Sequence, residues 1–137
     1  MLKYVIITIF ILIFNSKAYS LELVMIDSKA CYYCKKFLKE VAPEFNISKF
    51  PLVIVQNNNL PKWFSEAYKK KRIKPYKGTP VFIIWDEIEK YEIDRIFGYG
   101  GKDRFYKDLK DKLFAFMDTS GYSKDQFKKK YGIRWKK

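Results

Sequence analysis

The 137-residue chain contains no histidine and only two cysteines, and both shortages exclude common kinds of site. A structural zinc site takes four ligands, so half of them would have to be carboxylates or come from a second subunit. A c-type haem requires a histidine directly after its second cysteine, and Lys35 occupies that place. Two cysteines also cannot build the disulfide framework that supports a small secreted scaffold without a core. We therefore expect no resident metal and no cofactor.

Long apolar runs are also missing. The longest lies at residues 4–14, which is about half of what a helix needs to span a bilayer. It follows Lys3 and precedes Ala18-Tyr19-Ser20, which is the pattern of a cleaved export signal. We therefore predict a signal peptide at residues 1–20 and a single domain at residues 21–137. An uncleaved N-terminal membrane anchor or a buried strand is the alternative.

Charge of one sign dominates, with 28 Lys and Arg against 15 Asp and Glu, a net charge of +13. The cations are spread along the chain, with short clusters at residues 69–72 and 128–130. Both a solvated basic face and an anion-binding patch fit this distribution. An exported protein rarely meets nucleic acid, so we expect no nucleic-acid partner. Hydrophobic residues make up 48% of the chain, which is enough for one compact core.

Four short apolar segments predict strands, at residues 21–26, 51–56, 81–85 and 91–97. In the last of them, Tyr91, Ile93 and Phe97 alternate with Glu92 and Asp94. Helical spacing predicts helices after Cys34, after Pro61 and around Leu109, with an asparagine cap from residues 57–59 for the second. A short tail helix is expected between Ser123, which begins a capping box, and Gly132.

The resulting order of elements is β-α-β-α-β-β-α, followed by the short C-terminal helix. An alternation of strand and helix requires parallel first strands, and a strand pair joined by a short bend must be antiparallel. We therefore predict an α/β fold, a three-layer sandwich around a mixed four-stranded sheet.

Cys31-Tyr32-Tyr33-Cys34 is the constellation that carries chemistry, and it lies where the first strand turns into a helix. Unpaired N–H groups at a helix N-terminus favour a thiolate over a thiol. The first cysteine of such a pair is the more exposed one and attacks, and the second resolves the mixed disulfide. The pair therefore predicts thiol–disulfide exchange by Cys31 and Cys34, as a reductase of disulfides or as an oxidant or isomerase of them. A two-coordinate copper(I) site, or a partner-binding module without turnover, is the alternative.

Thr79-Pro80 stands directly before the most apolar strand and a Gly-containing turn precedes the last long helix. Together with the Cys-x-x-Cys pair, this arrangement resembles the thioredoxin superfamily. The resemblance implies a thioredoxin-like fold, a cis peptide bond at Pro80, and a Thr79 backbone that pairs with a bound substrate. Tyr32 and Tyr33 are candidates for substrate docking, or they are exposed loop residues without a role.

A narrower resemblance covers about residues 22–117. It rests on short segments that include 23–25, 40–43 and 95–99, and on the Cys-x-Tyr-Cys centre. These segments look like the periplasmic thioredoxins of bacterial sulfur-oxidation (Sox) clusters. That likeness implies an envelope protein that reduces a disulfide- or thiol-bearing partner and receives electrons from a membrane thiol transporter.

Two departures from thioredoxins concern the centre itself. Thioredoxins usually carry an acidic residue six positions before the first cysteine, and Met25 stands there. Asp27 is nearer and could replace that proton acceptor. The two tyrosines between the cysteines replace a Gly-Pro pair, so the reduction potential of thioredoxin does not carry over.

Overall fold

The computed structural model describes residues 21–47 and 49–133, so the predicted signal peptide at residues 1–20 lies outside the described residues. The order of elements is β1 (Leu21–Asp27), α2 (Tyr32–Glu40), a 3-10 turn η1 (Ala42–Glu44), β2 (Leu52–Gln56), α3 (Lys62–Lys69), β3 (Val81–Asp86), β4 (Tyr91–Phe97), α4 (Lys102–Thr119) and α5 (Lys124–Tyr131). This order confirms the predicted β-α-β-α-β-β-α pattern with a short C-terminal helix.

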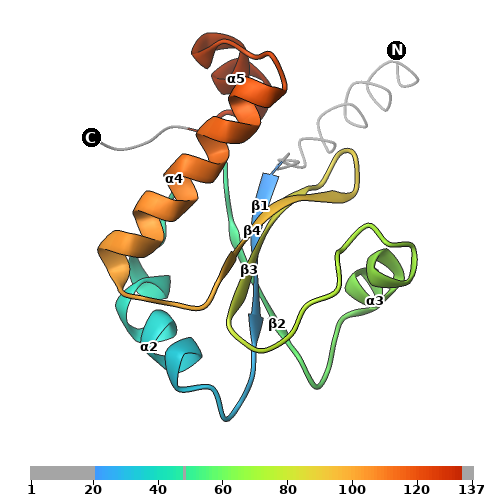
Figure 1. Cartoon of the computed structure of the whole chain (residues 1–137), viewed down its shortest axis with the longest axis vertical. Coiled ribbons are helices and arrows are strands. Elements are labelled where there is room, and N and C mark those ends of the chain that lie inside the picture. Colours follow the sequence, from blue (N-terminus) through green and yellow to red (C-terminus); the bar gives the residue numbers. More distant parts are fainter. Residues whose placement is uncertain (1–20, 48, 134–137) are drawn as a thin grey trace, which may run out of the picture.

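The four strands form one mixed sheet in the order β2-β1-β3-β4. β1 and β2 are parallel, and the pairs β1–β3 and β3–β4 are antiparallel. Helices α2 and α4 lie on one side of the sheet and α3 lies on the other (Figure 1). The predicted three-layer sandwich is therefore confirmed.

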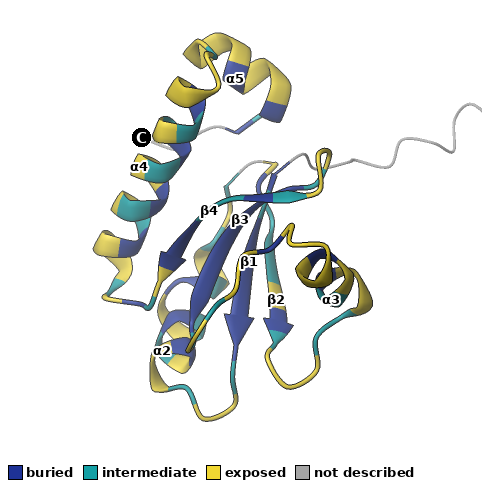
Figure 2. Cartoon of the chain, turned by 45° about the vertical axis from the view of Figure 1, so that its right-hand side comes forward, coloured by how far each residue is buried: buried dark blue, intermediate teal, exposed yellow. Residues whose placement is uncertain are grey.

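Each face of the sheet has its own core. Met25 of β1 and Phe82 of β3 pack with Phe37 of α2 on one face. The alternating residues Val24 and Ile83 pack with other side chains, including those of α3, on the opposite face. All six residues of β3 are buried, as Figure 2 shows in dark blue for the central strands. Because a central strand is covered on both sides, it reads in the sequence as an unbroken apolar run.

The start of α3 differs from the prediction. Pro61 is the N-cap, and no side chain caps the helix. The Asn57 side chain instead accepts a hydrogen bond from the Tyr76 hydroxyl at 2.9 Å, nineteen residues away in sequence. The predicted asparagine cap is therefore wrong, because Leu60 and Pro61 separate the three asparagines from Lys62, the first residue of the helix.

Burial along β4 does not follow the alternation in the sequence. Glu92 is buried, whereas Phe97 is 69% exposed. Arg95 explains the burial of Glu92: its guanidinium pairs with both oxygens of that carboxylate and also donates to the backbone oxygens of Lys74 and Pro75, at 2.8 and 3.0 Å. A buried charge persists only when it is paired and hydrogen-bonded, and this one is. The pair thereby fixes the chain segment that leads into β3.

The tail helix forms as predicted. Ser123 and Gln126 make the reciprocal bonds of a capping box, and Gly132 ends α5 in the left-handed conformation with φ of 66°. Phe127 and Tyr131 of α5 pack against Phe116 of α4. Among the residues that the structure describes, no helix combines the length and apolarity needed to cross a membrane.

Candidate functional site

The four strands bring their loops together at one end of the sheet, which we call the disulfide end. Ile26, near the end of β1, pairs with Val81 at the start of β3, and Val81 pairs with Phe97 at the end of β4. On the other side, Asp27 pairs with Gln56 at the end of β2. The disulfide end therefore gathers the loops that enter α2, α3, β3 and α4.

Cys31 and Cys34 form a disulfide at this end, with their Cα atoms 5.2 Å apart. Cys31 is the N-cap of α2, and the backbone N–H of Cys34 points at the Cys31 sulfur at 3.1 Å. Once the disulfide is reduced, this N–H and the positive end of the helix dipole stabilise a thiolate on Cys31. A turn positions Cys31 at the start of α2, and in this turn the Cys31 N–H donates to the Ser28 oxygen at 3.1 Å.

The two cysteines differ in burial. Cys34 is completely buried in the core cluster with Phe37 and Met25, whereas Cys31 is half-buried and packs at the edge of that cluster. A partner can therefore reach Cys31 but not Cys34. This asymmetry is what an attacking and a resolving thiol require.

The remaining predicted site residues flank the disulfide. Tyr32 and Tyr33 are 70% and 54% exposed, and their rings contact edge to face with centroids 5.3 Å apart. The Thr79–Pro80 peptide bond is cis, and Pro80 directly precedes the first residue of β3. Because β3 starts beside the end of β1, Thr79 and Pro80 lie at the same end of the sheet as the cysteines.

Phe97 is a further candidate site residue, which the sequence alone did not single out. It is the last residue of β4, its side chain is 69% exposed, and the Arg95 guanidinium lies 5.6 Å from its ring centroid. The next residue, Gly98, donates its N–H to the oxygen of Pro80 at 2.9 Å, which places Phe97 next to the Thr79–Pro80 segment. The signal available in the sequence was the position of Phe97 at a strand end before a glycine-rich loop.

The Asp27 carboxylate accepts hydrogen bonds through both of its oxygens, and its role as a replacement proton acceptor stays a prediction. One carboxylate oxygen accepts from the Ser28 N–H and the other from the Gln56 side chain, both at 2.8 Å. Met25 is fully buried in the same cluster as Cys34. The position of the usual thioredoxin acid is therefore apolar, and Asp27 ties the ends of β1 and β2 together.

Two segments that carry the narrower resemblance touch each other in the structure. The Tyr99 hydroxyl donates to the Glu40 carboxylate at 2.7 Å, and the Tyr99 ring contacts Phe37 on α2. Burial, and then the hydrogen bond to Glu40, raise the pKa of Tyr99 well above the ordinary value for a tyrosine. This bond joins the end of α2 to the loop after β4.

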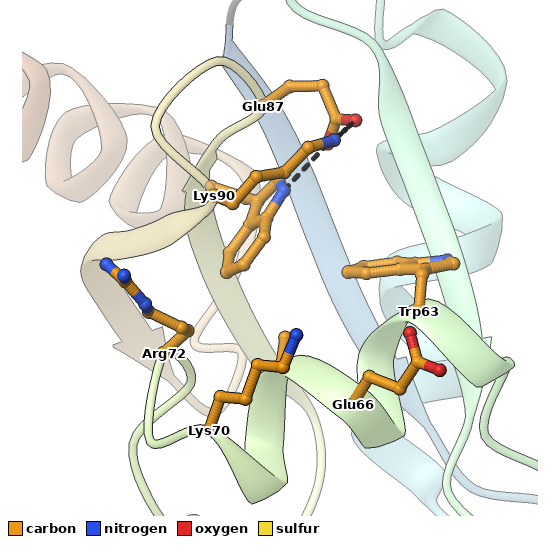
Figure 3. Close-up of a pocket in the computed structure, with 8 residues that line it drawn as sticks. Trp63, Glu66, Lys70, Arg72, Glu87 and Lys90 are labelled. Carbon is orange, nitrogen blue, oxygen red and sulfur yellow. Dashed lines mark hydrogen bonds and ion pairs between the residues drawn. The ribbon is translucent and has the colours of Figure 1, made fainter.

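A separate hollow of about 340 Å³ lies on the α3 side of the sheet (Figure 3). Trp63 and Trp85 form its aromatic walls, with ring centroids 5.8 Å apart. The Trp85 N–H donates to Glu87 at 2.8 Å, and Lys90 pairs with the same carboxylate. None of the site residues predicted from the sequence lines this hollow. Within residues 21–47 and 49–133, no cluster of three or more Cys, Asp or Glu is arranged to hold a metal ion.

Comparison with known proteins gives matches among solved structures. No protein-family model and no curated protein matches the chain. The periplasmic thioredoxin SoxS from Paracoccus pantotrophus is 25% identical, the match covers 68% of this chain and 95% of that one, and the TM-score is 0.55. A thioredoxin from Thermus thermophilus is 21% identical over 67% of this chain and 72% of that one, with a TM-score of 0.50.

These similarities confirm the thioredoxin-like fold and support a relationship between this chain and the thioredoxin superfamily. Together with the Cys31–Cys34 disulfide, they indicate a thiol–disulfide redox module. The roles of Cys31, Cys34, Tyr32, Tyr33, Thr79 and Pro80 stay predictions.

Proposed function

We propose that this protein is a thiol–disulfide oxidoreductase of the cell envelope that reduces a disulfide in a partner protein. The observation that carries the proposal is the asymmetric pair at the start of α2, in which Cys31 is accessible and Cys34 is buried. The likeness to a periplasmic thioredoxin supports it. Exchange through such a pair needs no metal or organic cofactor.

The reaction consists of two displacements. In the reduced protein, the Cys31 thiolate attacks one sulfur of the partner disulfide, which forms a mixed disulfide and releases one partner thiolate. The Cys34 thiol then loses its proton, which a released partner thiolate accepts directly or through water, and its sulfur attacks the Cys31 sulfur. This step closes the Cys31–Cys34 disulfide and releases the second partner thiolate. Two electrons pass from the protein to the partner, and the two released thiolates take up protons according to their pKa values.

The oxidised protein must then be reduced again, and we propose a membrane thiol transporter as the electron donor. This donor fits the export predicted from residues 1–20, which would place the domain outside the cytoplasm. Mass spectrometry of the protein from an envelope fraction tests the export. A mature chain that begins near Leu21 is expected, and a membrane-extracted chain that begins at Met1 would show an anchor instead.

Catalysed reduction of insulin by dithiothreitol tests the activity. We expect the wild-type protein to accelerate the reaction, and the double variant Cys31→Ser, Cys34→Ser to leave it at the uncatalysed rate. A copper(I) titration with a competing chelator, run on the reduced protein, tests the alternative. Tight binding of one equivalent of copper(I), together with no acceleration of insulin reduction, would contradict the oxidoreductase and favour a copper site.

A further inference from the structure

The loops at the disulfide end carry positive charge without any carboxylate. The segments that meet there are residues 28–36, 57–61, 75–80 and 98–101. Their charged side chains are Lys29, Lys35, Lys36 and Lys77. Lys36 is half-buried and the other three are exposed. Within the described part of the chain, none of these four lysines forms an ion pair.

The two carboxylates closest to these segments cancel only part of this charge. Asp27 directly precedes the first segment and offsets one of the four lysines. Asp103, in the first turn of α4, offsets one more, because the cations beside it, Lys102 and Arg104, pair with Glu44 and Asp108. Two positive charges remain. An approaching molecule therefore meets a positive field around Cys31.

The same end exposes aromatic surface. Tyr32, Tyr33 and Phe97 are all more than half exposed. Exposed rings at the same end of the sheet as a reactive group offer apolar contact area to a partner chain at a low cost in side-chain entropy. Contact with the rings would hold a partner segment, and the lysines would select its charge.

We propose that the partner presents its cysteine in an acidic segment of polypeptide, and that Lys29, Lys35, Lys36 and Lys77 recognise that segment. The inference rests on the proposed exchange through Cys31 and adds the chemistry of the substrate. Fields of this kind raise association rates by about 10–10³-fold, and salt removes much of the effect. The lysines therefore act on how fast a partner arrives rather than on the sulfur chemistry.

Three peptides of equal length test the inference. Each holds one cysteine as a mixed disulfide with 2-mercaptoethanol, flanked by four Glu, four Gln or four Lys. The second-order rate constant for reduction by the reduced protein is measured by quenched-flow mass spectrometry in 20 mM and 500 mM NaCl. We expect the Glu peptide to react about tenfold faster than the Gln peptide at low salt, with most of this preference lost at high salt. The Lys peptide should react more slowly than the Gln peptide.

Two triple variants with the same change in net charge locate the effect. One is Lys29→Gln, Lys36→Gln, Lys77→Gln. The control is Lys124→Gln, Lys128→Gln, Lys129→Gln on α5, which Figure 1 shows at the far end of the molecule from α2. We expect the Glu-to-Gln rate ratio to fall several-fold in the first variant and to stay unchanged in the second. Using the ratio removes any effect of the substitutions on the reactivity of Cys31 itself.

The outcomes separate this inference from the function on which it rests. Equal rates for the Glu and Gln peptides, or an equal loss of preference in both triple variants, would overturn the acidic partner while leaving the exchange reaction intact. Failure of all three peptides to react would overturn the proposed function as well.

Discussion

The two ends of the sheet are built differently. The β3–β4 hairpin end is rich in carboxylates and tied down by them. Five lie between residues 86 and 94: Asp86, Glu87, Glu89, Glu92 and Asp94. Asp86 accepts hydrogen bonds from the N–H groups of Ile88 and Glu89, both at 2.9 Å, and shapes the turn. Glu92 is buried against Arg95.

The disulfide end shows the opposite composition. Its loops hold lysines and exposed aromatic rings, and the carboxylate beside them, Asp27, is engaged by Ser28 and Gln56. Of the two cysteines at this end, only Cys31 is accessible to solvent. The comparison indicates that the hairpin end contributes to the stability of the fold, and the proposed chemistry lies at the disulfide end. Substitutions at the two ends should therefore affect different measurements.

The largest effect is expected from Cys31→Ser. Without the attacking thiolate, the rate of insulin reduction should fall at least about a thousandfold, to the uncatalysed level. The free energy of unfolding of the reduced protein should change by no more than about 1 kcal/mol, because the side chain lies at the edge of the core. Urea denaturation under reducing conditions measures this free energy of unfolding. Retention of activity by this variant would place the attacking thiol elsewhere.

Arg95→Ala should affect stability rather than chemistry, because the Arg95 guanidinium joins Glu92 near the hairpin to Pro75 and Phe97 nearer the disulfide end and does not contact either cysteine. The substitution leaves the buried Glu92 carboxylate without its partner, which costs about 3–5 kcal/mol of stability. The rate of exchange per folded molecule should stay within about twofold of wild type. Lys112→Ala is the matched control, because its pair with Asp94 at 3.1 Å is partly exposed and is expected to contribute about 0–1 kcal/mol. If Arg95→Ala lowers the free energy of unfolding by less than about 1 kcal/mol, the buried Glu92–Arg95 pair does not contribute to stability as proposed.

Tyr99→Phe should have a smaller effect that depends on pH. The lost hydrogen bond to Glu40 costs about 1 kcal/mol at pH 7. Because burial and Glu40 raise the pKa of Tyr99, the folded protein keeps this proton at a pH where the unfolded chain has lost it. Stability from this residue is therefore complete below pH 10, the ordinary pKa, and is lost as the pH rises above that.

Urea denaturation between pH 7 and pH 11 tests this expectation. The decline of wild-type stability above pH 10 should be shallower in Tyr99→Phe, and Tyr32→Phe should behave like wild type because that side chain is 70% exposed. An identical decline in Tyr99→Phe and wild type would show that Tyr99 does not contribute to it.

The smallest effect is expected on α5, at Ser123. Ser123→Ala removes the oxygen that accepts from the Gln126 N–H at 3.2 Å and should cost about 0.5–1 kcal/mol. Ser123→Asp retains a capping oxygen and should recover most of this loss. Thermal denaturation of the three proteins measures the difference. Equal melting temperatures for Ser123→Ala and wild type would mean that the capping box does not stabilise the domain.

The sequence was sufficient for the order of elements and for the place of the cysteine pair. Both follow from local patterns: apolar runs for the strands, helical spacing after Cys34, and the capping box at Ser123. The mixed sheet follows from those elements, because an α-helical connection joins parallel strands and a short bend joins antiparallel ones.

Contacts between distant residues could not be predicted in this way. Glu92 looks like a solvent-facing residue until Arg95 and the backbone of residues 74–75 are placed around it. Asn57 looks like a helix cap until Tyr76 reaches it. The Glu40–Tyr99 bond joins residues 59 apart, and only the folded chain brings them together. The side of the sheet that a side chain faces, and the distant residue that it contacts, depend on the assembled fold. They cannot be predicted from one segment of the sequence.

The most direct test of the central claim is to trap the partner through one cysteine. Cys34→Ser and Cys31→Ser are each expressed in the envelope, and adducts are separated on non-reducing gels and identified by mass spectrometry. The account predicts that Cys34→Ser accumulates a mixed disulfide through Cys31, because the buried resolving thiol is gone, and that Cys31→Ser accumulates none. Trapping by Cys31→Ser alone would reverse the two roles, and exchange that survives both substitutions would contradict the claim that this pair is the site.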